Sequence, residues 1–296
     1  MADAVTLFEV GPRDGLQNET WSIAAKDKIK LVNDLSACGF QRIEVTSFVS
    51  PKWVPQMADA AEVLNAIDRC AGVSYAALTP NMRGFEDAVA AKADEVAIFG
   101  AASEGFSQAN INCSIAESLA RFVPIIEAAR AADIPVRGYV SCITECPYDG
   151  AVPPDTVAAV AQDLFDMGCY EISLGDTIGA ATPTTINAVL DAVLERLPAA
   201  VLAGHYHDTN GQALANIEAS LARGVRVFDA AVGGLGGCPY APGAKGNVAT
   251  EAVAQRVASL GFETGLDVQR LQSAAKFAKE LRTLSLIHIS EPTRPY

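Results

Sequence analysis

The sequence predicts an α/β fold, a closed (β/α)8 barrel of the TIM type, from three observations. The chain has 296 residues, half of them apolar, which suffices for the core of one large barrel domain. Eight short apolar runs alternate with longer amphipathic segments, as in parallel strands joined by helices. After the first run the chain reads GPRDGLQNE, which is not the phosphate-binding glycine fingerprint of the competing doubly wound open sheet.

Each predicted strand is a short run that is rich in apolar and β-branched residues and lacks helical periodicity. In chain order the runs are VTLFEV from Val5, RIEVTSF from Arg42, VSYAAL from Val73, EVAIFG from Glu95, IPVRGYVSC from Ile134, YEISLG from Tyr170, AVLAGHYH from Ala200 and VRVFDAAV from Val225. A helical pattern follows each run, so the eight units predict a closed barrel.

Capping residues, prolines and glycines mark the helix boundaries. Asp155 follows two prolines and is expected to cap a helix that stops at Gly168. Thr182, followed by a proline, opens another helix. Similar helices are predicted over 28–38, 57–67, 213–223 and 250–260, and an extra helix is expected near the C-terminus.

The stretch 233–247, GGLGGCPYAPGAKGN, is too long for a tight connection and lacks the periodicity of a strand or a helix. We interpret it as a mobile active-site loop that acts as a lid. Residues 285–296 read SLIHISEPTRPY and resemble a translated cloning adapter. We therefore expect one catalytic domain over 1–284 and a non-native tail, and we exclude His288 from the site.

Composition excludes several classes of function. The chain carries 22 Lys+Arg against 35 Asp+Glu, a net charge of -13, so nucleic acid and anionic membranes are repelled at long range. No apolar run is long enough for a membrane helix, and no targeting leader is evident. The seven cysteines lack the paired spacing of a structural zinc site and are interpreted as reduced thiols. A cytoplasmic protein is expected.

Polar residues at the carboxyl ends of the predicted strands are the candidates for chemistry. His205 and His207 are separated by one residue of a strand, so both imidazoles project from one face and can bind one ion. Two hydrogen-bonded structural histidines are the alternative. Asp14 can add a carboxylate, or simply form a turn, and Asn247 can add an amide oxygen. Ligands without thiolate favour Mg²⁺ or Mn²⁺, with zinc left open.

Three further residue types suggest roles around the ion. Arg13 supplies positive charge where a carbonyl oxygen becomes negative, and an ion pair with Glu44 or Asp176 is its structural role. Those two carboxylates are predicted to support the site or to relay protons. Cys238, in the glycine-rich loop, is a candidate proton donor because a thiol is mostly protonated at neutral pH. An incidental small residue is the alternative for this position.

Five segments together resemble the 3-hydroxy-3-methylglutaryl-CoA lyase family, in its bacterial form. They are GPRDGLQNE from Gly11, VTSFVSPKWVPQM from Val45, NINCS from Asn110, GHYHDT from Gly204 and GLGGCPYAPGAKGN from Gly234. They span nearly the whole chain in the family order. Related Claisen-type synthases share the Arg-Asp pair and the HxH strand but lack the cysteine loop, so the last segment is the most specific.

The resemblance implies a metal-dependent carbon–carbon lyase, an oxo-acid-lyase, which cleaves hydroxymethylglutaryl-CoA to acetyl-CoA and acetoacetate in leucine degradation and ketone-body formation. It implies that a divalent cation is held by Asp14, His205, His207 and Asn247. Arg13 then stabilises the enolate-like thioester oxygen, Glu44 and Asp176 support the site, and Cys238 protonates the carbanion. The base stays open between Asp14, Asp176 and a metal-bound water.

The CoA moiety is expected across the barrel mouth. Its candidate contacts are Lys52, Asn110, Asn112, Ser114 and Lys245. A homodimer is expected from the resemblance alone. Two alternatives from other reactions are a condensing synthase or aldolase of the same barrel superfamily acting on a 2-keto acid, and a non-haem iron oxygenase with a two-histidine, one-carboxylate site. A catalytically silent binding protein is a third.

Overall fold

The computed structural model describes residues 3–19, 22–238 and 241–288, with side chains given except at 238, 241–245 and 283–288. Among the described residues, no helix is long and apolar enough to cross a membrane.

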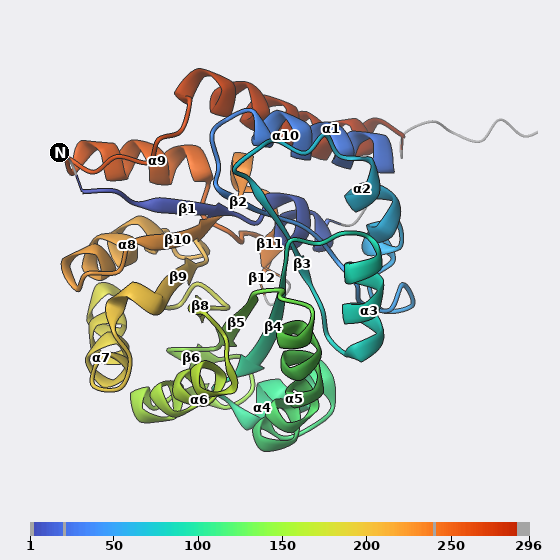
Figure 1. The fold of residues 1–296 in the computed structure, drawn as a ribbon. Coiled ribbons are helices and arrows are strands. Elements are labelled where there is room, and N and C mark those ends of the chain that lie inside the picture. The colour runs from blue at the N-terminus through green and yellow to red at the C-terminus, as the bar shows by residue number, and fades with distance from the viewer. Residues whose placement is uncertain (1–2, 20–21, 239–240, 289–296) are drawn as a thin grey trace, which may run out of the picture.

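Eight parallel strands close into a barrel, which confirms the predicted fold class and all eight predicted runs (Figure 1). The strands are β1 (Thr6–Glu9), β2 (Arg42–Ser47), β3 (Ser74–Leu78), β4 (Glu95–Ala101), β5 (Val136–Ser141), β8 (Glu171–Asp176), β9 (Leu202–Tyr206) and β10 (Val227–Ala230). β1 pairs with both β2 and β10, so the two ends of the sheet meet. The strands are buried on both faces, which explains their continuous apolar composition.

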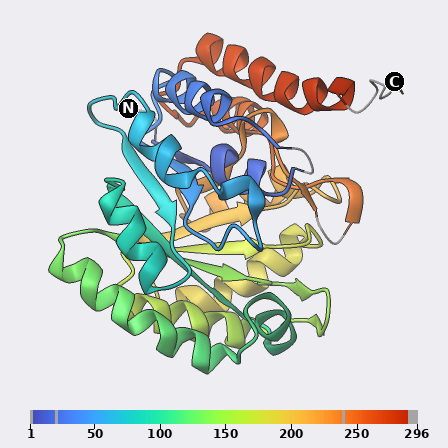
Figure 2. The ribbon, with the colours of Figure 1, turned by 90° about the vertical axis from the view of Figure 1, so that its right-hand side faces the viewer.

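The helices form an outer ring around the strands (Figure 1). They are α1 (Ala25–Ser36), α2 (Ala60–Ala66), α3 (Met82–Ala90), α4 (Glu104–Ile111), α5 (Ile115–Ala131), α6 (Pro154–Met167), α7 (Pro183–Leu194), α8 (Ala213–Ala222), α9 (Thr250–Ser259) and α10 (Val268–His288). The extra helix α10 packs against α1 and is seen beside it in Figure 2. Its backbone continues through 285–288, the first residues of the predicted tail, and 289–296 lie outside the described residues.

Two of the three predicted capping residues are confirmed. The Thr182 side chain accepts a hydrogen bond from the Thr185 amide in a capping box at the start of α7, and Gly168 ends α6 with a φ of 122°. The expected cap at Asp155 is wrong. Pro153 is the N-cap of α6, and Asp155 lies in the first turn of the helix. There its negative charge interacts favourably with the positive end of the helix dipole, but its side chain makes no capping hydrogen bond.

The glycine-rich segment is more regular than its sequence predicts. It contains an antiparallel pair, β11 (Gly237–Cys238) and β12 (Ala241–Lys245). The prediction that no strand forms there was wrong, because backbone pairing across a hairpin does not need a hydrophobic alternation. A similar small pair, β6 (Glu145–Cys146) and β7 (Gly150–Ala151), follows β5. Figure 2 shows residues 233–238 and 241–247 on the side of the barrel to which the strand arrows point.

Candidate metal centre and active site

The first strand delivers two functional residues through a single π-helical turn, Gly11–Gly15. The Val10 carbonyl accepts hydrogen bonds from the amides of Arg13 and Asp14, at 3.1 and 2.8 Å, and from that of Gly15 at 3.2 Å. Such turns are rare and concentrate at functional sites. This one places a cation and a carboxylate next to each other at the barrel mouth.

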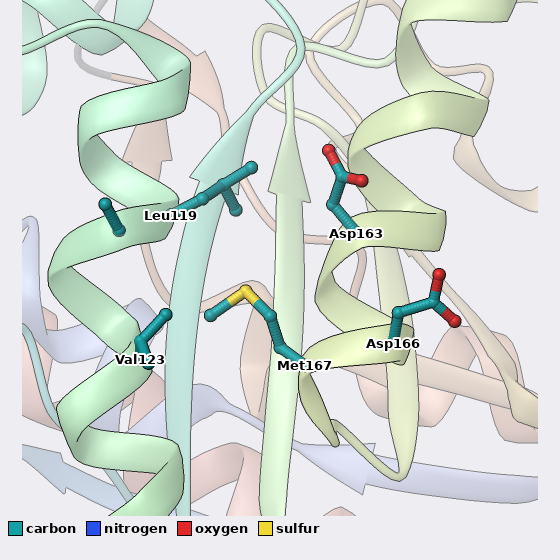
Figure 3. Close-up of a pocket in the computed structure, with 6 residues that line it drawn as sticks. Leu119, Val123, Asp163, Asp166 and Met167 are labelled. Atoms are coloured by element: carbon teal, nitrogen blue, oxygen red, sulfur yellow. The ribbon is translucent and has the colours of Figure 1, made fainter.

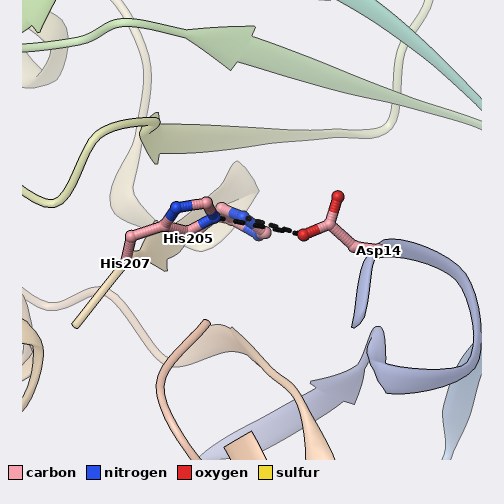
Figure 4. A group of neighbouring side chains, drawn as sticks. All are labelled: Asp14, His205 and His207. Atoms are coloured by element: carbon pink, nitrogen blue, oxygen red, sulfur yellow. Dashed lines mark ion pairs between the residues drawn. The ribbon is translucent and has the colours of Figure 1, made fainter. Parts of the chain in front are cut away.

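Asp14 meets the two histidines in one cluster (Figure 4). Its Oδ2 atom lies 3.9 Å from Nε2 of His205 and 4.0 Å from Nε2 of His207. One potential ligand atom of each residue lies within 4.8 Å of the other two. His205 belongs to β9 and His207 follows it, so the period of two residues brings both rings to the same side, as the sequence predicts.

Asn247, the last residue of the glycine-rich segment 233–247, also lies at this cluster. It forms an isolated antiparallel β-bridge with His207, and the adjacent Asp208 amide donates to the Gly246 carbonyl at 2.7 Å. The Asn247 side-chain amide donates to Oδ2 of Asp14 at 2.7 Å. All four residues predicted to bind a metal therefore come together around one carboxylate oxygen.

The protonation states of Asp14 and His207 suit a cation. The pKa of Asp14 falls to about 2 because Arg13 and the two histidines outweigh the effect of burial. The pKa of His207 falls to about 4, mainly through burial, so this ring is neutral at pH 7. Burial also acts to lower the pKa of His205, but the hydrogen bond and charge of Asp229 raise it above its ordinary value.

The donor set fits a divalent ion. The second ring nitrogen of His205, Nδ1, lies 3.2 Å from Oδ2 of Asp229, a buried carboxylate on β10. A proton on Nδ1 leaves Nε2 as a free lone pair facing Asp14, which is the arrangement that metal-binding histidines share. With an ionised carboxylate and a neutral His207 beside it, the cluster offers the nitrogen and oxygen ligands that the sequence predicts.

Arg13 lies beside the cluster and is held by two carboxylates. Its Nε donates to Oε2 of Glu44 and its Nη1 to Oδ1 of Asp14, both at 2.6 Å. These charges keep the pKa of Arg13 above its ordinary value despite burial. Burial raises the pKa of Glu44, although Arg13 opposes this. The Tyr139 hydroxyl donates to the same Glu44 oxygen at 3.2 Å. The predicted ion pair of Arg13 is therefore with Glu44, not with Asp176.

Asp176 ends β8 and is buried, and its carboxylate is occupied by the loop that follows it. The amides of Ala180 and Ala181 donate to its two oxygens at 3.1 and 3.0 Å. Burial raises its pKa to about 6. Asp176 therefore fixes the loop that follows β8 at the barrel mouth.

Of the predicted CoA contacts, the four with described side chains, Lys52, Asn110, Asn112 and Ser114, lie outside the metal cluster. Lys52 is exposed on the turn after β2, and Asn110 and Asn112 are exposed at the end of α4. Ser114 is engaged as the N-cap of α5, in a capping box with Glu117. The side chains of Cys238 and Lys245 lie outside the described residues, although their backbones form part of β11 and β12.

Sequence reasoning missed several buried polar residues inside the barrel. Asp229 contacts His205 from below, and Arg137 in turn contacts Asp229. Tyr139 contacts Glu44, and its ring meets that of His205 edge-on with centroids 6.1 Å apart. A signal was present for two of them, because Asp229 and Arg137 each interrupt an otherwise apolar strand.

Surface grooves of the described chain lie outside the cluster, two of them between elements of the barrel wall. One, of about 380 Å³ between α5 and α6, is lined by Leu119, Ala120, Val123, Asp163, Asp166 and Met167 (Figure 3). The other, of about 630 Å³, runs between the segment after β2 and helix α3, with Phe48, Pro51 and Arg83 in its lining. Neither contains a residue of the metal cluster. The convergent polar groups are therefore the basis for placing the site.

Comparisons with known proteins show the family of the chain. The HMGL-like family model matches residues 4–278. A 3-hydroxy-3-isohexenylglutaryl-CoA/hydroxy-methylglutaryl-CoA lyase of Pseudomonas aeruginosa is 59% identical over 92% of this chain and 91% of its own length. The mitochondrial hydroxymethylglutaryl-CoA lyase of Bos taurus is also 59% identical, over 92% of this chain and 84% of its own.

Solved structures show the same likeness. An HMG-CoA lyase from Brucella melitensis is 60% identical, with a TM-score of 0.95 over 95% of this chain and 100% of that one. An HMG-CoA lyase from Acinetobacter baumannii, solved with coenzyme A and 3-methylmalate, is 35% identical with a TM-score of 0.90, over 99% of this chain and 97% of that one.

Proposed function

The chain belongs to the HMGL-like family, and from this membership and the site we propose that it cleaves 3-hydroxy-3-methylglutaryl-CoA to acetyl-CoA and acetoacetate. The observation that carries the proposal is the cluster of Asp14, His205 and His207 with Arg13 beside it at the barrel mouth. The reaction is a carbon–carbon cleavage, which places the chain among the oxo-acid-lyases. It fits a role in leucine degradation and ketone-body formation.

A divalent cation is the cofactor, and we propose Mg²⁺ or Mn²⁺. Asp14, His205 and His207 would hold it, because their ligand atoms lie within 4.8 Å of one another. Asn247 would add its amide oxygen after its side-chain amide turns over, since in this structure its N–H group donates to Asp14. When bound there, such an ion polarises the substrate's oxygen atoms and lowers the pKa of its tertiary hydroxyl.

Arg13 stabilises the charge that develops during cleavage. As the carbon–carbon bond breaks, its electron pair passes to the acetyl fragment, and the thioester oxygen becomes enolate-like. The guanidinium is fixed by Glu44 and Asp14 before substrate arrives, so no reorganisation is needed when the charge forms. Glu44 therefore acts by orienting Arg13.

Cys238 is proposed as the acid that protonates the acetyl-CoA carbanion. Its backbone lies in β11, in the segment that ends at Asn247, so this hairpin is anchored at the cluster. A thiol is largely protonated at neutral pH, and a covering hairpin would keep bulk water from the carbanion. The base that removes the hydroxyl proton stays open between Asp14, Asp176 and a metal-bound water.

Three further parts of the proposal concern the CoA contacts, the oligomeric state and the cellular location. The proposed CoA contacts are Lys52, Asn110, Asn112, Ser114 and Lys245, and the complex of the Acinetobacter relative with coenzyme A supports an acyl-CoA ligand. A homodimer is proposed from the resemblance. A cytoplasmic location is proposed because the six cysteines with described side chains are free thiols.

The nearest alternative is a condensing synthase or aldolase of the same barrel superfamily. It would share Arg13 and the cation but act on a 2-keto acid, and the cysteine hairpin favours the lyase. Family membership gives no support to a non-haem iron oxygenase or to a silent binding protein.

The direct test is to incubate the full chain with hydroxymethylglutaryl-CoA and measure acetoacetate. The expected result is activity that EDTA removes and that Mg²⁺ or Mn²⁺ restores. Product that is independent of metal, or no product with metal present, would reject the proposal.

A further inference from the structure

The interior of this barrel is charged where such barrels are usually filled by Val, Ile and Leu. Arg137 of β5 is fully buried, and its guanidinium lies 4.3 Å from the centroid of the Phe8 ring and 4.9 Å from that of Tyr139. A charge in this position needs partners with opposite charge.

Those partners form a line of ion pairs that rises through the barrel. Nε of Arg137 donates to Oε1 of Glu171 at 2.7 Å, and Glu171 is paired with Arg42 at 3.0 Å. The two terminal nitrogens of Arg137, Nη1 and Nη2, donate to Oδ2 and Oδ1 of Asp229 at 3.0 and 2.7 Å. Asp229 then contacts Nδ1 of His205 at 3.2 Å. Counted from the start of their own strands, Arg42 and Glu171 are first and Arg137 is second. Asp229 is third and His205 is fourth, so the line ends at the metal cluster.

Stability does not account for this arrangement. Replacing a buried ion pair by well-packed apolar side chains is often neutral or stabilising, by about 1–4 kcal/mol. Folding stability alone therefore gives no reason for a line of such pairs in a barrel core. Its effect must be sought at the end where it contacts a functional group.

The carboxylate of Asp229 cannot easily reorient. Its Oδ2 accepts from Nη1 of Arg137 and from the Ser173 hydroxyl at 2.8 Å, while Oδ1 accepts from Nη2 of Arg137. This leaves Oδ2 as a fixed acceptor below His205. An acceptor there keeps the proton on Nδ1 and turns Nε2 toward Asp14.

We infer that Asp229, clamped by Arg137, is a positioning residue that holds His205 in the tautomer and ring orientation required for binding the cation. The inference depends on the proposed function in one respect, namely that a divalent cation binds at this cluster. It concerns how tightly the ion is held, not which substrate is cleaved.

The test measures Mn²⁺ affinity in the metal-stripped full chain, by the electron paramagnetic resonance signal of free Mn²⁺. Asp229→Asn keeps the shape of the side chain but has one oxygen, so it cannot accept from both prongs of Arg137 and from His205. The expected result is a 10–100-fold weaker Kd. Arg137→Lys keeps the charge but loses the two-pronged grip, and it should weaken binding in the same direction.

Tyr75→Phe is the matched control. It removes a buried side-chain hydrogen bond of another barrel strand, from the Tyr75 hydroxyl to Ser36, without touching Asp229, Arg137 or His205, so its Kd for Mn²⁺ should equal that of the wild type. Thermal unfolding of each variant reports separately on the fold. Variants at 229 and 137 that unfold earlier but bind Mn²⁺ as the wild type does would overturn the inference. A wild-type chain that binds Mn²⁺ and releases no acetoacetate would instead reject the proposed function and leave this inference standing.

Discussion

The buried pair of Arg13 and Glu44 allows catalysis and folding to be separated in one set of variants. The two side chains are 7% and 0% exposed, and their atoms lie 2.6 Å apart. Arg13→Met would leave Glu44 with the Tyr139 hydroxyl as its one hydrogen-bond partner among the described residues. Asp14 would keep the Asn247 amide and its contacts with the histidines.

The cost follows from the charge that is left behind. Removing one partner of a buried ion pair lowers the free energy of unfolding by about 3–5 kcal/mol. Burial already raises the pKa of Glu44 against the opposing charge of Arg13, so the pKa rises further without it. A pKa above its unfolded value gives stability that is present at low pH and is lost as pH rises. The full cost should therefore appear at pH 8, and a smaller cost at pH 5, where Glu44 can take up a proton.

The double variant Arg13→Met/Glu44→Gln removes the stranded charge. It should recover most of the stability at pH 8, since contacting residues are coupled by up to about 3 kcal/mol. Cleavage should not recover, because loss of one preorganised donor to a developing oxyanion costs about 10²–10³ in kcat.

Urea unfolding at pH 5 and pH 8, together with acetoacetate release, checks all three expectations. Equal destabilisation of Arg13→Met at both pH values would refute the electrostatic reasoning. A double variant that cleaves substrate at the wild-type rate would show that Arg13 is purely structural.

Two further predictions concern a proton donor and a buried acid. Cys238→Ala should abolish cleavage and leave the Kd for Mn²⁺ unchanged, with Cys70→Ala, an exposed thiol, as the control; undiminished turnover would refute the acid role. Burial raises the pKa of Glu9 to about 7, so wild-type stability should fall between about pH 4.5 and pH 7, by on the order of 3 kcal/mol. Glu9→Gln should flatten this fall in urea unfolding, and an unchanged slope would contradict it.

The fold and the common face of His205 and His207 could be predicted because both depend on local periodicity. The alternation of apolar runs with amphipathic segments specifies parallel strands and helices without knowledge of any contact. His205 and His207 are two residues apart on a strand, so their common face follows from strand geometry alone. Asp14 could be added because the first and last strands of a closed barrel must be neighbours.

The support beneath the site could not be predicted in the same way. Arg137 and Asp229 are 92 residues apart in the sequence, and their pairing depends on which face of each strand turns inward and on the stagger between strands. A charged residue in an apolar strand signals that a partner exists but does not say which one. The hairpin of β11 and β12 escaped prediction because backbone hydrogen bonds, not side-chain patterns, define it.

Tyr139 links the two halves of this support into one unit. Its ring faces the guanidinium of Arg13 at 5.5 Å and that of Arg137 at 4.9 Å, measured to the centroid, and its hydroxyl donates to Glu44. The same ring packs edge-on against His205. In the roles proposed above, Arg13 supplies its own charge to the mouth and Arg137 the orientation of His205. Because the ring of Tyr139 contacts both guanidinium groups, we expect a substitution at either arginine to change the surroundings of the other. The proposed oxyanion-stabilising group and the proposed metal ligand are therefore connected through one buried polar network.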